Sequence, residues 1–208
     1  MKVLVFPALL GLLVISICMN LLQYQQTQRL AQQLYVSEYD ARTSHHILDQ
    51  QEEFLEVMTK HVMGAADIDS KFKARYYARA YIDAAADYRL DPRLLLLLTR
   101  VESGFDSHAK SNKGALGMMQ IMPKVWMEQI DFISTDKDLT DPYLNIHAGA
   151  HVLRHYLNRA QGDVRLALLM YNRGEHAVRK AIVQGLDPSN GFARKVLNGQ
   201  ALRTRWDS

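Results

Sequence analysis

The chain has 208 residues, of which 48% are hydrophobic and 23% charged, a composition that fits one globular domain with additional segments. Residues 23–208 hold 24 Lys and Arg (25 less Lys2) against 22 Asp and Glu, so the charge balance gives no reason to expect a nucleic acid partner. Cys18 is the single cysteine, which excludes an intrachain disulfide and a cysteine-rich zinc site.

The first predicted element is a transmembrane anchor over residues 1–22. Residues 3–22 carry no ionisable side chain apart from the Cys18 thiol, and their length matches that of a helix that crosses a bilayer. Because Lys2 precedes this segment, the charge bias favours an N-terminus in the cytoplasm. A cleaved signal peptide is the alternative, although no A-x-A-like cleavage site follows the apolar segment.

Residues 23–70 are predicted to form a helical stalk. Leu48, Leu55 and Val62 are seven residues apart, and Met58 lies three residues after Leu55, a spacing typical of one helix face. These positions are too few to assign a coiled coil. A stalk that pairs with another copy or with a protein partner, and a lone amphipathic helix that packs on the domain, therefore both stay open.

Residues 71–208 are predicted to form a nearly all-α domain. Asp91-Pro92 and Asp141-Pro142 are helix starts, because aspartate caps the first turn and proline suits it. Gly104 and Gly162 end these two helices. No strand-like alternation of useful length occurs. Further helices are predicted from Asp163 to Gly174, over about 175–184 and over 192–198.

An earlier helix of this domain carries several aromatic residues. Phe72 and Tyr76 begin a series of positions that recur every four residues, as in a helix. Tyr76, Tyr77 and Tyr81 are interpreted as core residues rather than as a ligand-binding cluster.

Glu102 is the candidate general acid. It follows five leucines at 94–98 and lies about ten residues after Asp91, in the last turn of its helix. The carbonyl end of a helix carries partial negative charge and the apolar run removes water, so both effects favour the protonated carboxyl. A proton held near neutral pH is what a general acid needs. A surface glutamate that closes a helix is the alternative.

The loop after Glu102 leads into a mixed apolar and polar segment, MMQIM, before Pro123. A glutamine flanked by Met119 and Ile121 is expected to be buried and hydrogen-bonded. Methionines beside it can line a groove for the apolar faces of sugar rings, although such a strip also suits a core.

Four motifs together resemble the soluble lytic transglycosylase domain family. They are "ESGF" with Ser111 after it, "GALGMMQIMP", "NIHAGAHVL" and "MYNRG", and they occur in the family's order and spacing. The resemblance covers roughly residues 80–200. It implies a goose-type lysozyme-like fold and cleavage of the β-1,4 bond between N-acetylmuramic acid and N-acetylglucosamine in the glycan strands of peptidoglycan.

The resemblance also implies roles for single residues. Glu102 matches the family's one catalytic acid, and Tyr171 matches a tyrosine whose hydroxyl faces that carboxyl. Met118 and Arg173 depart from the leucine and alanine that are usual in the family. The substrate-binding residues implied by the motifs are Ser111, Gln120, Met122, Tyr171 and Asn172.

A single carboxyl can serve this reaction if the substrate supplies the nucleophile. Ordinary glycosidases use two carboxylates, but the nearest second candidate, Asp106, is better explained as a loop cap. Glu102 would protonate the bridging oxygen and then accept the proton of the muramic C6 hydroxyl, which closes a 1,6-anhydro ring. Tyr171 and Gln120 would orient the groups and stabilise charge. The alternatives are a hydrolysing goose-type lysozyme and a catalytically weak wall-binding or assembly module.

His147, His151 and His155 lie four residues apart on one helix face. They are interpreted as a half-exposed polar face rather than as a zinc site, because no glutamate follows His147 as in H-E-x-x-H and no fourth ligand is apparent. No metal and no cofactor are expected. Together with the anchor, the resemblance predicts a single-pass protein of the bacterial inner membrane with its catalytic domain in the periplasm.

Overall fold

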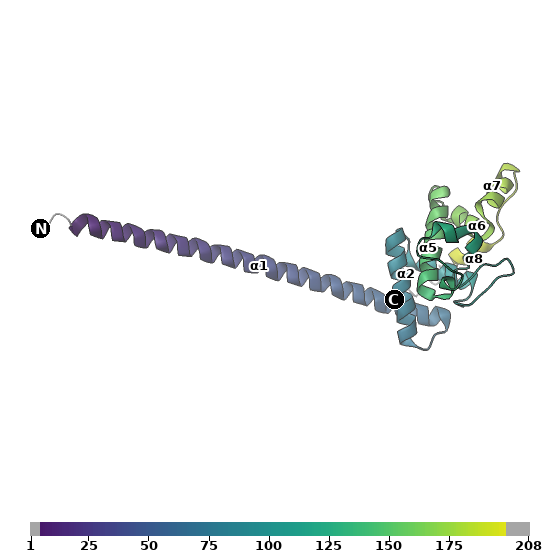
Figure 1. Cartoon of the computed structure of the whole chain (residues 1–208), viewed down its shortest axis with the longest axis horizontal. Coiled ribbons are helices and arrows are strands. Elements are labelled where there is room, and N and C mark those ends of the chain that lie inside the picture. Colours follow the sequence, from purple (N-terminus) through teal and green to yellow (C-terminus); the bar gives the residue numbers. More distant parts are fainter. Residues whose placement is uncertain (1–4, 199–208) are drawn as a thin grey trace. The chain divides into compact units, whose positions relative to one another are not determined.

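The computed structural model describes the backbone of residues 5–198 and the side chains of residue 13 and residues 15–198. Every regular element in this part of the chain is helical (Figure 1), as the sequence predicts for the domain. The chain divides into two compact units, and the boundary along the sequence lies between Glu53 and Phe54. The helices are α1 (Val5–Ala66), α2 (Lys71–Tyr88), α3 (Pro92–Glu102), α4 (Pro123–Trp126), η1 (Met127–Gln129), η2 (Asp138–Thr140), α5 (Pro142–Arg159), α6 (Val164–Arg173), α7 (Glu175–Val183) and α8 (Phe192–Asn198).

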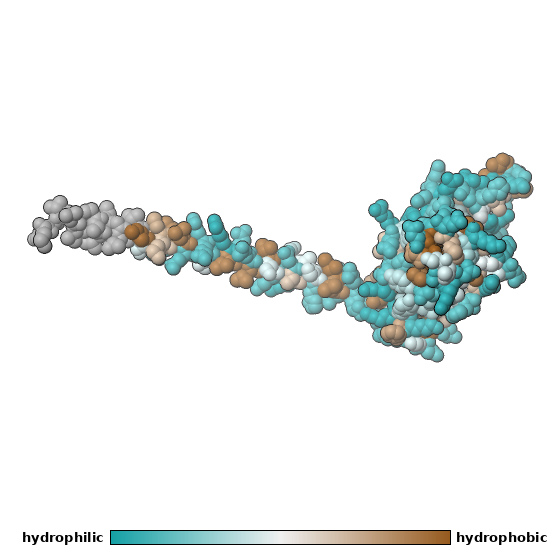
Figure 2. Space-filling model, viewed as in Figure 1, coloured by the Kyte–Doolittle hydropathy of each residue, from teal (hydrophilic) through white to brown (hydrophobic). Residues whose placement is uncertain are grey.

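In the first unit the described residues belong to helix α1. Their side chains are exposed, and apolar ones such as Leu30 and Leu34 alternate with polar ones along the helix (Figure 2). No helix in the described part of the chain has a stretch long and apolar enough to cross a membrane. The structure does not support the anchor predicted over residues 1–22, of which residues 1–4 lie outside the described backbone and residues 1–12 and 14 outside the described side chains.

The second unit includes the last turns of α1. Leu55, Met58 and Val62 are buried there, whereas Leu48, which shares their seven-residue spacing, is 60% exposed. The compact unit thus begins inside the segment predicted as a stalk, at Phe54. Burial of this apolar face explains why α1 continues into the second unit and ends there.

Helix α3 forms the centre of the second unit. It contacts α2, α5 and α8, and all five leucines at 94–98 are buried together with Thr99. A helical segment that is apolar on every side, as residues 94–98 are, belongs inside a protein. The Thr99 hydroxyl donates to the carbonyl of Leu95, so its polar group is satisfied within the helix.

Aspartate caps fix the starts of three helices. Asp91, Asp141 and Asp163 each accept a hydrogen bond from a backbone N–H two or three residues ahead, at the beginnings of α3, α5 and α6. The predicted starts of these helices are therefore confirmed. The N–H groups of a first turn have no intrahelical partner, and the caps supply one.

The aromatic residues of α2 divide between core and surface. Tyr77 and Tyr81 are buried, as predicted, but Tyr76 is 42% exposed and Phe72 is 87% exposed. The prediction that Tyr76 belongs to the core is wrong, because the contact of its ring with Tyr143 leaves 42% of the residue exposed.

Candidate functional site

Glu102 is the last residue of α3, and its side chain is half-buried. Burial raises the pKa of its carboxyl from an ordinary value of 4.5 to about 7. The five buried leucines before it place the carboxyl at the edge of the core. The predicted environment of this glutamate is thus present: an apolar site at the carbonyl end of a helix.

The segment from Leu116 to Ile121 forms a tight turn beside this helix end. The backbones of these two residues exchange N–H to O hydrogen bonds of 2.8 and 2.9 Å. Met118 and Met119, between them, are fully buried. The hydroxyl of Ser103, the residue after Glu102, donates to the Met118 carbonyl oxygen at 2.7 Å. The turn is therefore bonded directly to the neighbour of the candidate acid.

Tyr171, near the end of α6, contacts the next carbonyl of the same turn. Its hydroxyl donates to the Met119 oxygen at 2.8 Å. Burial raises the pKa of this hydroxyl well above its ordinary value, and the nearby Glu102 carboxyl adds to the rise. Tyr171 thus lies close to Glu102, and its hydroxyl donates its hydrogen bond to the turn.

Asn145, in the first turn of α5, holds the turn from the other side, and sequence reasoning missed its role. Its Oδ1 accepts from the Met119 N–H at 2.7 Å, and its Nδ2 donates to the carbonyls of Leu116 at 3.1 Å and Leu139 at 2.8 Å. The residue is 1% exposed. An amide at a helix position flanked by apolar residues is a signal for such a role, because asparagine is unfavourable inside helices unless its side chain bonds elsewhere.

Two glycines allow the turn and α5 to approach this closely. A Cβ on Gly117, which has φ +75°, would lie 2.1 Å from the Leu139 oxygen and 2.3 Å from Asn145 Nδ2. A Cβ on Gly149 would lie 2.2 Å from the sulfur of Met119. All three distances are far inside van der Waals contact, so these positions require glycine.

Ser111 organises the loop that precedes the turn. Its hydroxyl accepts hydrogen bonds from the N–H groups of Lys113 at 3.3 Å and Ala115 at 3.0 Å. Asp106 accepts from the N–H of His108 at 2.8 Å, which confirms its predicted role as a loop cap. Both side chains stabilise the loop between Glu102 and the turn.

Gln120 is half-buried rather than buried, with φ +52°. Its Nε2 donates to the carbonyls of Gly117 at 2.9 Å and Ala109 at 3.3 Å, so the predicted hydrogen bonding is confirmed. Met122 is half-buried at the start of α4. Asn172 is exposed, and its Oδ1 accepts from the amide of Asn190 at 2.8 Å.

The histidine face of α5 is more buried than predicted. His147 is 8% exposed, its ring stacks on Tyr143 at 4.5 Å, and its Nδ1 lies 3.6 Å from a carboxylate oxygen of Asp87. His151 and His155 are half-buried and pack edge-on against Trp126. The prediction of a half-exposed polar face is wrong for His147, because aromatic rings cover it. Within the described residues, no group of three His, Cys, Asp or Glu side chains is arranged to hold a metal ion.

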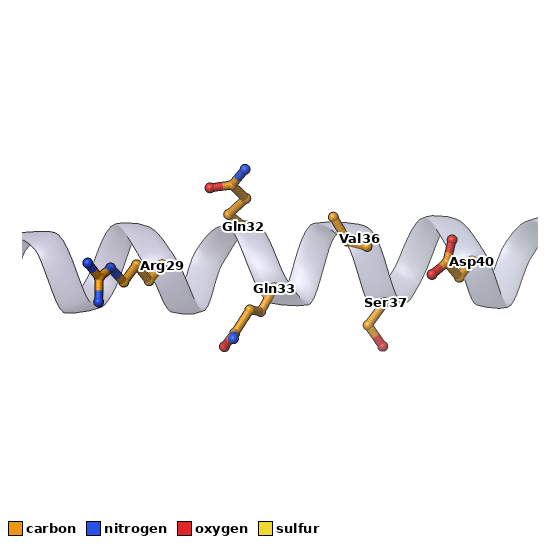
Figure 3. Close-up of a pocket in the computed structure, with 6 residues that line it drawn as sticks. All are labelled: Arg29, Gln32, Gln33, Val36, Ser37 and Asp40. Carbon is orange, nitrogen blue, oxygen red and sulfur yellow. The ribbon is translucent and has the colours of Figure 1, made fainter.

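A hollow on the surface of α1 is formed by one helix alone (Figure 3). A single helix face has no opposing wall, so this hollow does not enclose a ligand. It is lined by Arg29, Gln32, Gln33, Val36, Ser37 and Asp40.

Comparison with known proteins gives a consistent picture. The family model for the transglycosylase SLT domain matches residues 79–188. A transglycosylase of Enterobacteria phage PRD1 is 41% identical over 96 residues, which are 44% of this chain and 32% of that protein. The match thus spans about a third of the curated relative's length.

Two solved structures are similar to part of the chain. The 70 kDa soluble lytic transglycosylase SLT70 of Escherichia coli is 23% identical, with 61% of this chain and 24% of that chain covered and a TM-score of 0.52, a likeness in fold. Lytic transglycosylase Slt of Pseudomonas aeruginosa, solved as an inactive mutant, is 28% identical, with 57% and 22% covered and a TM-score of 0.49.

Proposed function

The chain belongs to the transglycosylase SLT domain family, and on that premise we propose that it is a peptidoglycan lytic transglycosylase with Glu102 as its single acid and base. The observation that carries the proposal is the environment of this carboxyl, at the buried end of α3 with its pKa raised to about 7. About half of such groups hold a proton at neutral pH, so both the acid and the base form are accessible.

The reaction begins with proton transfer. The Glu102 carboxyl gives its proton to the oxygen that bridges N-acetylmuramic acid and N-acetylglucosamine, and the bond from muramic C1 to this oxygen breaks. The carboxylate then accepts the proton of the muramic C6 hydroxyl, whose oxygen bonds to C1. The products are a free N-acetylglucosamine end and a 1,6-anhydromuramic acid end, and no water is consumed.

One carboxyl suffices for these steps because the substrate provides the nucleophile. Some other carboxyls have a pKa shifted in the opposite direction to that of Glu102, which makes them poor acids at neutral pH. The carboxyls with a lowered pKa are Glu56, Asp138, Glu175 and Asp187.

The turn at 116–121 supports the acid in this proposal. Ser103 and Tyr171 bond successive carbonyls of the turn, at Met118 and Met119, and so hold the ends of α3 and α6 in register around Glu102. The residues proposed to bind the glycan strand, from the family motifs, are Ser111, Gln120, Met122, Tyr171 and Asn172.

A hydrolysing lysozyme would use the same acid and differ only in the fate of the sugar. Mass spectrometry of purified peptidoglycan digested by the protein, with Glu102→Gln in parallel, separates the two. Products one water lighter than lysozyme fragments, absent with Glu102→Gln, support the proposal. Hydrated ends would indicate a muramidase, and full activity of Glu102→Gln would overturn the role of this residue. No products from either protein would favour a wall-binding or assembly module.

The location of the protein is also a proposal, and it rests on the sequence. The uncharged residues 3–22, preceded by Lys2, favour a single-pass protein of the inner membrane with its catalytic domain in the periplasm. Exposed apolar residues along α1 leave room for self-association or a protein partner. Carbonate extraction of membranes tests the anchor: release of the protein into the soluble fraction would contradict it.

A further inference from the structure

A pocket away from Glu102 lies where the end of α1 meets α2. It is lined by Leu55, Phe72, Arg75, Tyr76 and Arg79, all within the second unit. None of them belongs to the motifs that carry the family resemblance. The pocket combines a buried aliphatic side chain, two aromatic rings and two guanidinium groups.

The two aromatic rings are available to a ligand. Phe72 and Tyr76 are four residues apart on α2 and therefore lie on one face of the helix. They are 87% and 42% exposed. The Tyr76 ring contacts those of Tyr77 and Tyr143 with centroids 6.1 and 6.2 Å apart, which fixes its orientation. Leu55, 5% exposed, adds an apolar surface. Such a surface suits the apolar face of a sugar ring.

The two arginines add positive charge beside the rings. Arg79 Nε lies 3.8 Å from Asp83, which is longer than a hydrogen bond. The Arg79 side chain is 58% exposed. Exposed ion pairs of this kind contribute little, so Arg79 can bind a carboxylate of a ligand in exchange. Guanidinium binds carboxylate with two parallel hydrogen bonds.

We propose that this pocket is a second glycan-binding site, which takes a muramic acid residue of peptidoglycan. The sugar ring packs on Phe72 and Tyr76, and Arg79 binds a carboxylate. That carboxylate belongs either to the lactyl group of a strand without peptide or to the stem peptide. The choice of ligand rests on the proposed function, since it is the acidic sugar of that substrate. Such a site would hold the insoluble wall while the acid acts elsewhere on the strand.

The test is an NMR titration of the full chain with Glu102→Gln, which prevents turnover, read from the amide signals of α2. The probes are the N-acetylglucosamine–N-acetylmuramic acid disaccharide, the same disaccharide with its peptide, and chitobiose, which has no carboxylate. We expect the α2 signals to shift with an acidic probe, and the better of the two acidic probes identifies the source of the carboxylate. Phe72→Ala should weaken binding by about tenfold, equivalent to ~1.4 kcal/mol. Arg79→Gln should remove the preference over chitobiose.

The matched control is Val183→Ala on α7, because Val183 is 86% exposed and lies outside the pocket. This variant should bind like the parent. Unshifted α2 signals, or equal affinity in Phe72→Ala and Val183→Ala, would overturn the inference. Shifts that depend on protein concentration alone would also overturn it, since they would mark a contact between copies. Failure of the proposed function is seen separately, as the absence of anhydro products with wild-type Glu102.

Discussion

The amide of Asn145 binds the backbone of Met119: its Oδ1 accepts from the Met119 N–H at 2.7 Å, in a site where Asn145 is 1% exposed. The carbonyl of the same Met119 accepts from the Tyr171 hydroxyl. Asn145 therefore joins α5 to the turn that also bonds Ser103 and Tyr171. Asn145, Ser103 and Tyr171 together hold the turn beside the proposed acid.

Replacement of Asn145 should be costly. Asn145→Leu takes the side-chain partner from the Met119 N–H and the Leu139 carbonyl, whereas the Leu116 carbonyl keeps the Ile121 N–H. Each buried polar group left without a partner costs about 1–3 kcal/mol. We expect a large fall in melting temperature and in turnover. Asn158→Leu is the control, because Asn158 is exposed on the same helix. Equal melting temperatures for the two variants would show that the amide of Asn145 does not hold the turn.

Two effects require glycine at position 117, the close neighbouring atoms and the positive φ, and comparison with Gly114 separates them. Gly117 and Gly114 both have positive φ, +75° and +87°, but a Cβ on Gly114 would meet nothing within 4 Å. Gly114→Ala should therefore cost only the left-handed conformation, roughly 1–2 kcal/mol. Gly117→Ala adds overlap with Leu139 and Asn145 and should lose much more stability in denaturant unfolding. A similar loss for both would mean that the contact relaxes without cost.

The stability of the second unit should depend on the last turns of α1. Met58 is fully buried there, so Met58→Ala should lose about 2–5 kcal/mol of unfolding free energy. Leu48→Ala, on the exposed part of α1, should change it by less than about 0.5 kcal/mol. Urea unfolding of the two variants measures both values. An unchanged free energy of unfolding in Met58→Ala would indicate that the compact unit starts after α1.

The raised pKa of Glu102 makes stability depend on pH. Its folded pKa is about 7 against an ordinary 4.5, so between these values the folded state holds a proton that the unfolded state has released. Stability therefore falls as pH rises through this window. The Glu102→Gln variant lacks this titration. Between pH 5 and pH 8 its free energy of unfolding should therefore rise relative to that of the wild type by on the order of 2 kcal/mol. A constant difference between the two proteins across this range would contradict the shift.

Local sequence signals predicted the helix starts and the buried acid. Aspartate caps act within one turn, and five successive leucines leave no polar face, so α3 and the environment of Glu102 follow from nearby residues. The contacts of Asn145 could not be predicted in this way. Those with Met119 and Leu116 join residues 26 and 29 positions apart, and no local pattern encodes such a distance.

The exposure of single helix residues was predicted less well for the same reason. Tyr76 and His147 were assigned from helix periodicity, but their exposure depends on which distant element covers them. Phe132 and Tyr143 contact His147, whereas the ring of Tyr76 stays partly exposed. Periodicity gives the face of a helix, and only tertiary packing decides what lies against that face.

The most direct test of the central claim is a titration of the Glu102 carboxyl carbon by ¹³C NMR, with the signal assigned by its loss in Glu102→Gln. Glu175 is the internal reference, because hydrogen bonds from Arg159 and Arg179 lower the pKa of its carboxyl to about 2. The account predicts that Glu102 titrates near pH 7 while Glu175 stays ionised down to strongly acidic pH. A Glu102 carboxyl that titrates at its ordinary value of 4.5 would contradict the claim that this residue holds a proton for the glycan bond.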